Sequence, residues 1–160
     1  HGDIQIDPVY KRLRNEGAER FAYEVRSQFG GEPILMEKVA RNVLKNRRRF
    51  RALVLLADQS PGGRDNVYWT EWLNQPTGFF LGPATISQLT GFPVMFARCR
   101  RKARGRYHLS LIPIVETPGQ LTEEQIIEAY IRAAEQTIRE EPESYLWSNR
   151  RWKHQPQGVT

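Results

Sequence analysis

The feature that most constrains the fold is the unbroken apolar run Ala52-Leu53-Val54-Leu55-Leu56-Ala57. An apolar run of this length is typical of a strand that is covered on both faces, as the strands of a parallel sheet are. Helical patterns precede and follow the run, and this alternation of helices and strands predicts an α/β fold. A length of 160 residues fits a single domain, and no linker or repeat suggests an internal boundary.

The spacing of apolar residues predicts the remaining elements. The helix after Thr122 has the clearest start, because Thr122 and Gln125 form a capping box, and it should end before Pro142. Its buried stripe should consist of Ile127, Ile131, Ala134 and Ile138. The other expected elements are a strand at 4–10, a helix at 12–29, an extended segment at 33–36, a helix at 37–47, an irregular aromatic segment at 66–82, a helix at 83–89, and strands at 93–100 and 106–114.

Two apolar stripes are expected to face inward from the first two helices. The residues concerned are Leu13, Phe21, Val25 and Phe29 in the first helix, and Val39, Val43 and Leu44 in the second.

The chain carries a net charge of +6, which favours an anionic partner such as nucleic acid, a phospholipid surface or a phosphorylated substrate. Basic residues gather at 47–49, 98–106 and 150–153. Such clusters are usually solvated surfaces, and the alternative is a patch that binds phosphate groups through arginine. No recognition-helix or RNA-binding signature accompanies them, so a nucleic-acid partner is not expected.

Asp58 and Gln59 follow the apolar strand directly, at the place where open α/β sheets collect their ligands. A carboxylate there can hold a substrate hydroxyl, a cation or a neighbouring arginine. An aspartate that only caps a turn is an equally good interpretation.

The residues do not form a complete catalytic set. His1, His108 and His154 lack a context typical of a general base, and the single cysteine, Cys99, excludes an internal disulfide. No cluster has metal-ligand spacing, and no glycine-rich phosphate loop is present. The sequence therefore predicts neither a metal site nor a cofactor. No segment is apolar enough to span a bilayer.

Six segments, in order, resemble the bacterial lipid A biosynthesis acyltransferases. They are VYKRLRN (9–15), RSQFGGEPI (26–34), LLADQSP (55–61), TGFPVMF (90–96), GRYHLSLIPI (105–114) and EEPESYLWSNRRWKHQP (140–156). The ending resembles the family's closing P-E-x-(Y/W)-x-W-x-H-R-R-(W/F)-K, with Asn149 in place of histidine. Arg12 stands where the first motif usually has proline. The stretch 57–83 looks most like the branch found in Bacteroidetes-type bacteria, of the lauroyl or myristoyl acyltransferase type.

The resemblance implies a glycerolipid-acyltransferase-like mixed sheet flanked by helices, at the cytoplasmic face of the inner membrane. The implied reaction moves a fatty acyl group from acyl carrier protein to a hydroxyl of a phosphorylated lipid A precursor. The family's base is a histidine five positions before an acidic residue, and His1 is followed at that distance by Ile6. We therefore expect the chain to be the carboxyl-terminal part of a lysophospholipid-acyltransferase-like domain, inactive alone, with the motif upstream.

By the same resemblance, Tyr10, Lys11 and Arg26 bind substrate, with Lys11 meeting a phosphate or the developing oxyanion, and Asp58 and Gln59 line the acceptor pocket. The basic charge should face phosphorylated sugars and an anionic membrane surface.

The ending should be structural. Trp147, Arg150, Arg151 and Trp152 are expected to form a last helical turn or two packed on the domain, with Trp147 buried and in cation–π contact with Arg151. Two rival functions remain: a basic module that binds nucleic acid, and a non-catalytic relative that only binds anionic lipid.

Overall fold

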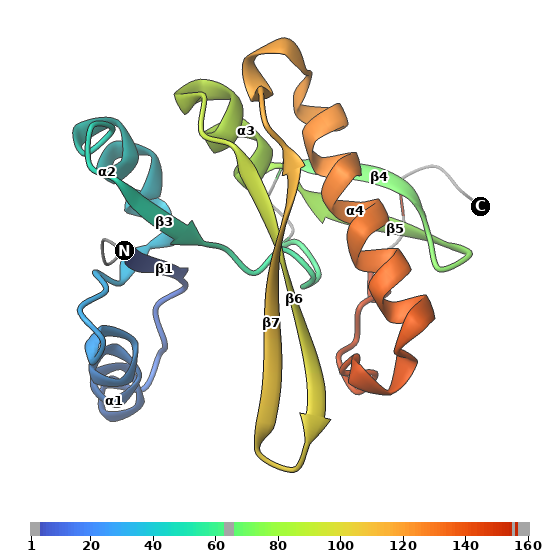
Figure 1. Cartoon of the computed structure of the whole chain (residues 1–160), viewed down its shortest axis with the longest axis horizontal. Helices are drawn as coiled ribbons and strands as arrows, with labels where there is room; N and C mark the ends of the chain where they lie inside the picture. Colours follow the sequence, from blue (N-terminus) through green and yellow to red (C-terminus); the bar gives the residue numbers. More distant parts are fainter. Residues whose placement is uncertain (1–3, 63–65, 155, 157–160) are drawn as a thin grey trace. The chain divides into compact units, whose positions relative to one another are not determined.

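The computed structural model describes residues 4–62, 66–154 and 156 (Figure 1). Helices and strands are mixed throughout, so the predicted α/β class is confirmed. The chain divides into two compact units, His1–Leu56 and Ala57–Thr160, and each is described by itself. That the chain forms one domain stays a prediction.

The first unit contains a three-stranded parallel sheet in the order β2-β1-β3. Strand β1 (Gln5–Tyr10) pairs with β2 (Ile34–Leu35) on one side and with β3 (Arg51–Val54) on the other. Two crossover connections join these strands. The first carries α1 (Glu16–Ser27), and the second carries the 3₁₀ turn η1 (Met36–Lys38) and α2 (Val39–Lys45). Parallel pairing of the apolar run is thus confirmed.

The core of the first unit is smaller than the sequence predicted. Ile34, Val39 and Val43 are buried, and the last two are two of the three positions of α2 that were predicted to face inward. Helix α1 buries none of its residues, and Phe29 just beyond it is 91% exposed, so the predicted inward stripe on that helix is wrong. Leu44 is exposed, and so are Ala52, Val54 and Leu56, which alternate along the apolar run. The predicted coverage of both faces of this strand is therefore wrong.

A buried ion pair joins strands β1 and β3 of this unit. Asp7 on β1 and Arg51 on β3 lie 2.8 Å apart, and their side chains are 0% and 1% exposed. Asp7 also accepts hydrogen bonds from the backbone N–H of Glu32 and from Gln5 Nε2, while Arg51 donates to Asn42 Oδ1. Gly31 allows its own backbone to lie close to the Ile6 carbonyl oxygen of β1, because a Cβ at position 31 would be only 2.2 Å from that oxygen.

The second unit contains two antiparallel hairpins and two helices. Strands β4 (Val67–Trp72) and β5 (Gln75–Phe80) form the first hairpin, and β6 (Val94–Ala103) and β7 (Arg106–Val115) form the second. Helix α3 (Gly82–Thr90) lies between the hairpins in sequence, and α4 (Glu123–Glu140) follows them. The irregular segment predicted at 66–82 is wrong, because it is the first hairpin; the second hairpin, α3 and α4 are confirmed.

The core of the second unit forms around α4. The predicted stripe Ile127, Ile131, Ala134 and Ile138 is buried, and the capping box of Thr122 and Gln125 is present. Nine buried residues contact one another here: Trp72, Phe79, Leu81, Ala84, Val115, Ile126, Ile127, Ile131 and Ile138. Figure 1 shows α4 running alongside both hairpins, which explains why its apolar stripe is covered.

The chain ending packs on this core, but it is not helical. Residues 147–152 form turns after the 3₁₀ turn η3 (Pro142–Ser144). Arg151 is buried, and its guanidinium lies over the rings of Phe79 and Trp72, at 4.4 and 5.6 Å from their centroids. Trp147 is 53% exposed and stacks edge-on against Tyr145. The predicted helix, the burial of Trp147 and its contact with Arg151 are therefore wrong.

Candidate functional site

The first candidate cluster joins the end of β1 to α1. The guanidinium carbon of Arg26 lies 4.6 Å from the centroid of the Tyr10 ring, a cation–π contact. Tyr10 donates its hydroxyl proton to Glu19 Oε1 at 3.1 Å, and the other carboxylate oxygen of Glu19 accepts from the backbone N–H of Leu13. Asn15 caps α1 by accepting from the N–H of Ala18, which fixes where the helix begins.

In this cluster Tyr10 is neutral, and one N–H group of Arg26 lacks a hydrogen-bond partner among the described residues. Burial and the neighbouring Glu19 carboxylate raise the pKa of Tyr10, so its hydroxyl keeps its proton. Arg26 Nη1 is buried without a hydrogen-bond partner in the described part of the chain. A buried guanidinium N–H lacking a partner is costly, and an incoming carbonyl or anionic oxygen would satisfy it. Lys11, next along the chain, is exposed.

The second candidate cluster surrounds Asp58 in the other unit. Asp58 is half-buried in the bend after the apolar run, and its charge acts on Arg151, Tyr130 and Tyr145. Burial, and secondarily Asp58, raises the pKa of both tyrosines, whereas burial lowers the pKa of Arg151. The Tyr145 hydroxyl is buried and has no partner among the described residues. Such a carboxylate with a neighbouring phenol can hold a hydroxyl group.

Arg151 fixes the position of this second cluster. Its Nη2 donates to the Gly78 carbonyl oxygen at 2.7 Å, and its own carbonyl oxygen accepts from Ser60 Oγ at 2.9 Å. The neighbouring Trp152 donates from Nε1 to Thr77 Oγ1 at 2.8 Å. The ending therefore ties the bend that carries Asp58 to the first hairpin of the unit.

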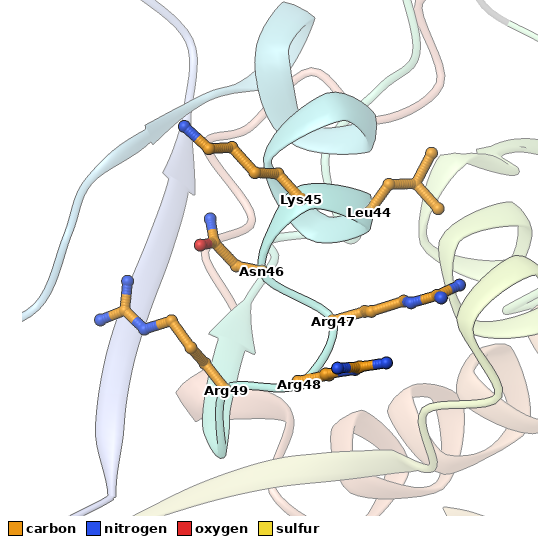
Figure 2. A pocket seen from close by; sticks show the side chains of 6 residues that line it. All are labelled: Leu44, Lys45, Asn46, Arg47, Arg48 and Arg49. Carbon is orange, nitrogen blue, oxygen red and sulfur yellow. The ribbon is translucent and has the colours of Figure 1, made fainter.

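A basic pocket lies where α2 leads into β3, in the first unit (Figure 2). It has a volume of about 310 Å³, and its lining is the single stretch 44–49. Arg49 is occupied, because it donates to Gln5 Oε1 at 2.6 Å and lies 3.5 Å from a Glu32 carboxylate oxygen. In Figure 2, Arg47 and Arg48 extend side by side in the same direction, away from Arg49. The pocket can thus offer two arginines to an anion, although both are exposed to water.

The structure brings together some of the predicted site residues. Tyr10 and Arg26 are in contact, Lys11 follows Tyr10 along the chain, and Asp58 faces a polar cluster, whereas Gln59 is exposed. The two clusters belong to different units. Substrate binding by any of these residues stays a prediction.

Sequence reasoning missed three members of these clusters: Glu19, Tyr130 and Tyr145. The asparagine cap at residue 15 was a usable signal for Glu19, since it places Glu19 in the first turn of the helix. Tyr145 stands inside the motif at the chain ending, whereas nothing local marks Tyr130.

The described residues provide neither a metal-binding cluster nor a membrane-spanning helix. Among them, no group of three or more histidine, cysteine, aspartate or glutamate side chains is arranged to hold a metal ion. None of the helices in residues 4–62, 66–154 and 156 combines the length and the apolar character that crossing a bilayer requires.

Comparison with known protein families gives the class of protein. Residues 5–154 match the family described as bacterial lipid A biosynthesis acyltransferase. Since the match covers nearly the whole of the 160 residues, the chain belongs to this family of acyltransferases, as the six motifs indicated. A search of curated proteins found no match.

Proposed function

We propose that the chain serves an acyltransferase reaction that moves a fatty acyl group from acyl carrier protein to a hydroxyl of a phosphorylated lipid A precursor. The observation that carries this proposal is the family match across residues 5–154. In the reaction, a base takes the hydroxyl proton, the oxygen attacks the thioester carbonyl, and the pantetheine thiol leaves as the new ester forms. The Bacteroidetes-like subtype and the lauroyl or myristoyl donor belong to the proposal.

The first cluster supports a role in binding the reacting groups. Arg26 has a buried Nη1 without a partner in the described residues, and the Tyr10 ring positions its guanidinium through the cation–π contact. Together with the exposed ammonium of Lys11, the Arg26 guanidinium can stabilise a phosphate or the oxyanion that develops on the thioester carbonyl.

The second cluster supports a role in binding the acceptor. Asp58 can accept a hydrogen bond from a sugar hydroxyl, and the Tyr145 hydroxyl nearby lacks a protein partner in the described residues. Gln59 is exposed next to Asp58 and can contact the same group.

The general base is proposed to lie outside the 160 residues. Neither His108 nor His154 has an acidic residue five positions further on, where Pro113 and Val159 stand. The basic charge of the chain agrees with a place at the cytoplasmic face of the inner membrane, where anionic lipids would attract it.

Acyl transfer to a radiolabelled phosphorylated lipid A precursor, with acyl-acyl carrier protein as donor, tests the proposal. The 160-residue chain alone should release no thiol, and the longer gene product that supplies the histidine motif should form the ester. In that longer protein, Asp58→Ala should slow ester formation about tenfold or more, whereas Glu116→Ala, which removes an exposed carboxylate, should not. Turnover by the 160 residues alone, or an active Asp58→Ala enzyme, would contradict the assignment.

The nucleic-acid rival has a separate measurement. Retention of the chain on single-stranded DNA that falls steeply with salt would favour it, because released counterions dominate such binding. We expect weak retention, since the aromatic residues of the second unit lie mostly in its core or its ending.

A further inference from the structure

The β6–β7 hairpin has one face that is occupied by its own unit. On that face, the rings of Phe96 and Tyr130 of α4 lie 5.9 Å apart. Arg98 and Arg100 form ion pairs with Glu140 at the end of α4, and Arg100 forms another with Glu141. This face is therefore contacted by α4 and by Glu140 and Glu141 of the same unit.

The opposite face of the hairpin is apolar and exposed. The register places Ala97 opposite Leu111, Cys99 opposite Leu109 and Arg101 opposite Tyr107, and residues paired in this way point to the same side of the sheet. Leu109 and Leu111 are each 61% exposed, and Tyr107 is 66% exposed. Side chains of this size in an exposed row are typical of an interaction surface rather than of a solvated strand.

The tip of the hairpin, at one end of this face, is positively charged. It carries Arg101, Lys102, Arg104 and Arg106, all exposed, around a turn at Gly105 with φ of 70°. Among the described residues, no carboxylate forms an ion pair with any of these four, and Glu140 and Glu141 pair with Arg98 and Arg100 instead. The hairpin thus combines an apolar face with an unneutralised cationic end.

We propose that this apolar face and cationic tip dock onto a bilayer of anionic phospholipid. The leucine row would enter the boundary between headgroups and acyl chains, and the tip cations would meet lipid phosphates. An anionic lipid surface complements the positive charge of the tip. A nucleic acid could bind the tip cations as well, but it would leave the apolar side chains of Leu109 and Leu111 in water. This inference rests on the membrane location in the proposed function, and it names the surface responsible.

Cys99 provides a built-in probe of this face. It is the single cysteine of the chain, it is exposed, and it lies opposite Leu109. A polarity-sensitive fluorophore attached to Cys99 should shift to the blue with vesicles of phosphatidylglycerol and phosphatidylcholine in equal parts. The shift should weaken with added salt and be absent with pure phosphatidylcholine. Cosedimentation of the unlabelled protein with the same vesicles checks that the label does not create the binding.

Paired variants separate this surface from the overall charge. Lys102→Glu with Arg104→Glu should weaken vesicle binding roughly tenfold or more. Arg20→Glu with Arg41→Glu changes the net charge equally at exposed positions of the first unit and should weaken binding much less. Leu109→Ser with Leu111→Ser should abolish the fluorophore shift, and circular dichroism verifies that each variant is folded.

Four results would overturn the proposal. In the first, Cys99 resists modification in the folded protein, and in the second, the protein cosediments with vesicles but the fluorophore does not shift. In the third, the two charge variants weaken vesicle binding equally. In the fourth, the protein forms a dimer that buries Cys99 in the absence of lipid. A larger shift with single-stranded DNA than with vesicles would assign the surface to nucleic acid instead. Because these measurements contain no acyl donor, their failure leaves the acyl-transfer proposal intact, and failure of acyl transfer leaves them intact.

Discussion

The two units of this chain are stabilised in different ways. The second unit has nine mutually packed core residues arranged around an 18-residue helix. The first unit has a three-stranded sheet held by a buried ion pair, and its longest helix buries no residue. Apolar burial is the main favourable term in folding, whereas a buried ion pair mostly offsets its own desolvation. The comparison indicates that the second unit carries most of the intrinsic stability.

Loss of the central aromatic should have the largest effect and tests the strength of the second unit. Trp72 is 1% exposed and contacts the rings of Phe79, Tyr145 and Trp152. Trp72→Ala should destabilise this unit by about 3–5 kcal/mol, seen as faster hydrogen exchange along α4. Phe21→Ala, at an exposed position of α1, should change exchange in the first unit very little. A large effect of Phe21→Ala would reverse the comparison.

Breaking the ion pair should have the next largest effect and tests the first unit. Arg51→Met would leave Asp7 buried and charged without a partner, which costs about 3–5 kcal/mol of stability. Protonation of Asp7 would reduce this loss. Hydrogen exchange along β1 measures the loss. Asp7→Asn with Arg51→Met removes both charges and should recover part of it.

The same pair predicts how the first unit responds to acid. Burial raises the pKa of Asp7, but hydrogen bonds from the Glu32 N–H, Arg51 and Gln5 outweigh it, so the folded pKa lies below the ordinary value. The stabilisation is complete above the unfolded pKa of about 4 and is lost as pH falls through the folded pKa. The protection factors of the β1 amides, which correct for the intrinsic pH dependence of exchange, should fall over that interval, and Asp7→Asn should flatten the dependence. An unchanged profile would remove Asp7 as its source.

A smaller effect is expected at Trp152. Trp152→Phe keeps an aromatic ring but removes the hydrogen bond to Thr77 Oγ1, which should cost about 1 kcal/mol. Thr77 still donates to the Gln75 carbonyl oxygen, so its hydroxyl proton keeps its acceptor. Thermal unfolding of the second unit measures this change, and an unaltered midpoint would mean that the ending is undocked.

The smallest effect is expected at Trp147. Because this side chain is half exposed, Trp147→Ala should cost less than about 1 kcal/mol, far below the loss expected for a buried tryptophan. Thermal unfolding of this variant, measured beside that of Trp152→Phe, compares the contributions of the two tryptophans of the ending to stability. A loss as large as that of Trp72→Ala would show that Trp147 is buried.

Much of the local structure was predictable. The capping box at Thr122, the stripe on α4, the β6–β7 turn at Gly105 and the parallel pairing of the apolar run were all expected and are all present. The first hairpin was missed because its turn has positive φ at Leu73 and Asn74. Leucine seldom adopts that conformation, so the usual glycine signal was absent.

The candidate site was only partly predictable. Tyr10, Arg26 and Asp58 were named from motif resemblance, and two of them prove to be in contact. Their partners were not named, because Glu19 depends on the exact start of α1, and Tyr130 depends on how α4 packs beside the bend at Asp58.

By itself, the sequence determined the family, the α/β class and the elements whose signals lie within a few residues of one another. Only the tertiary structure decided which apolar and charged side chains are buried. Arg51 binds Asp7 across 44 residues of chain, and Arg151 binds Gly78 across 73. Periodicity shows which side chains share a face, but burial depends on whether another element covers that face, and that contact is not encoded locally.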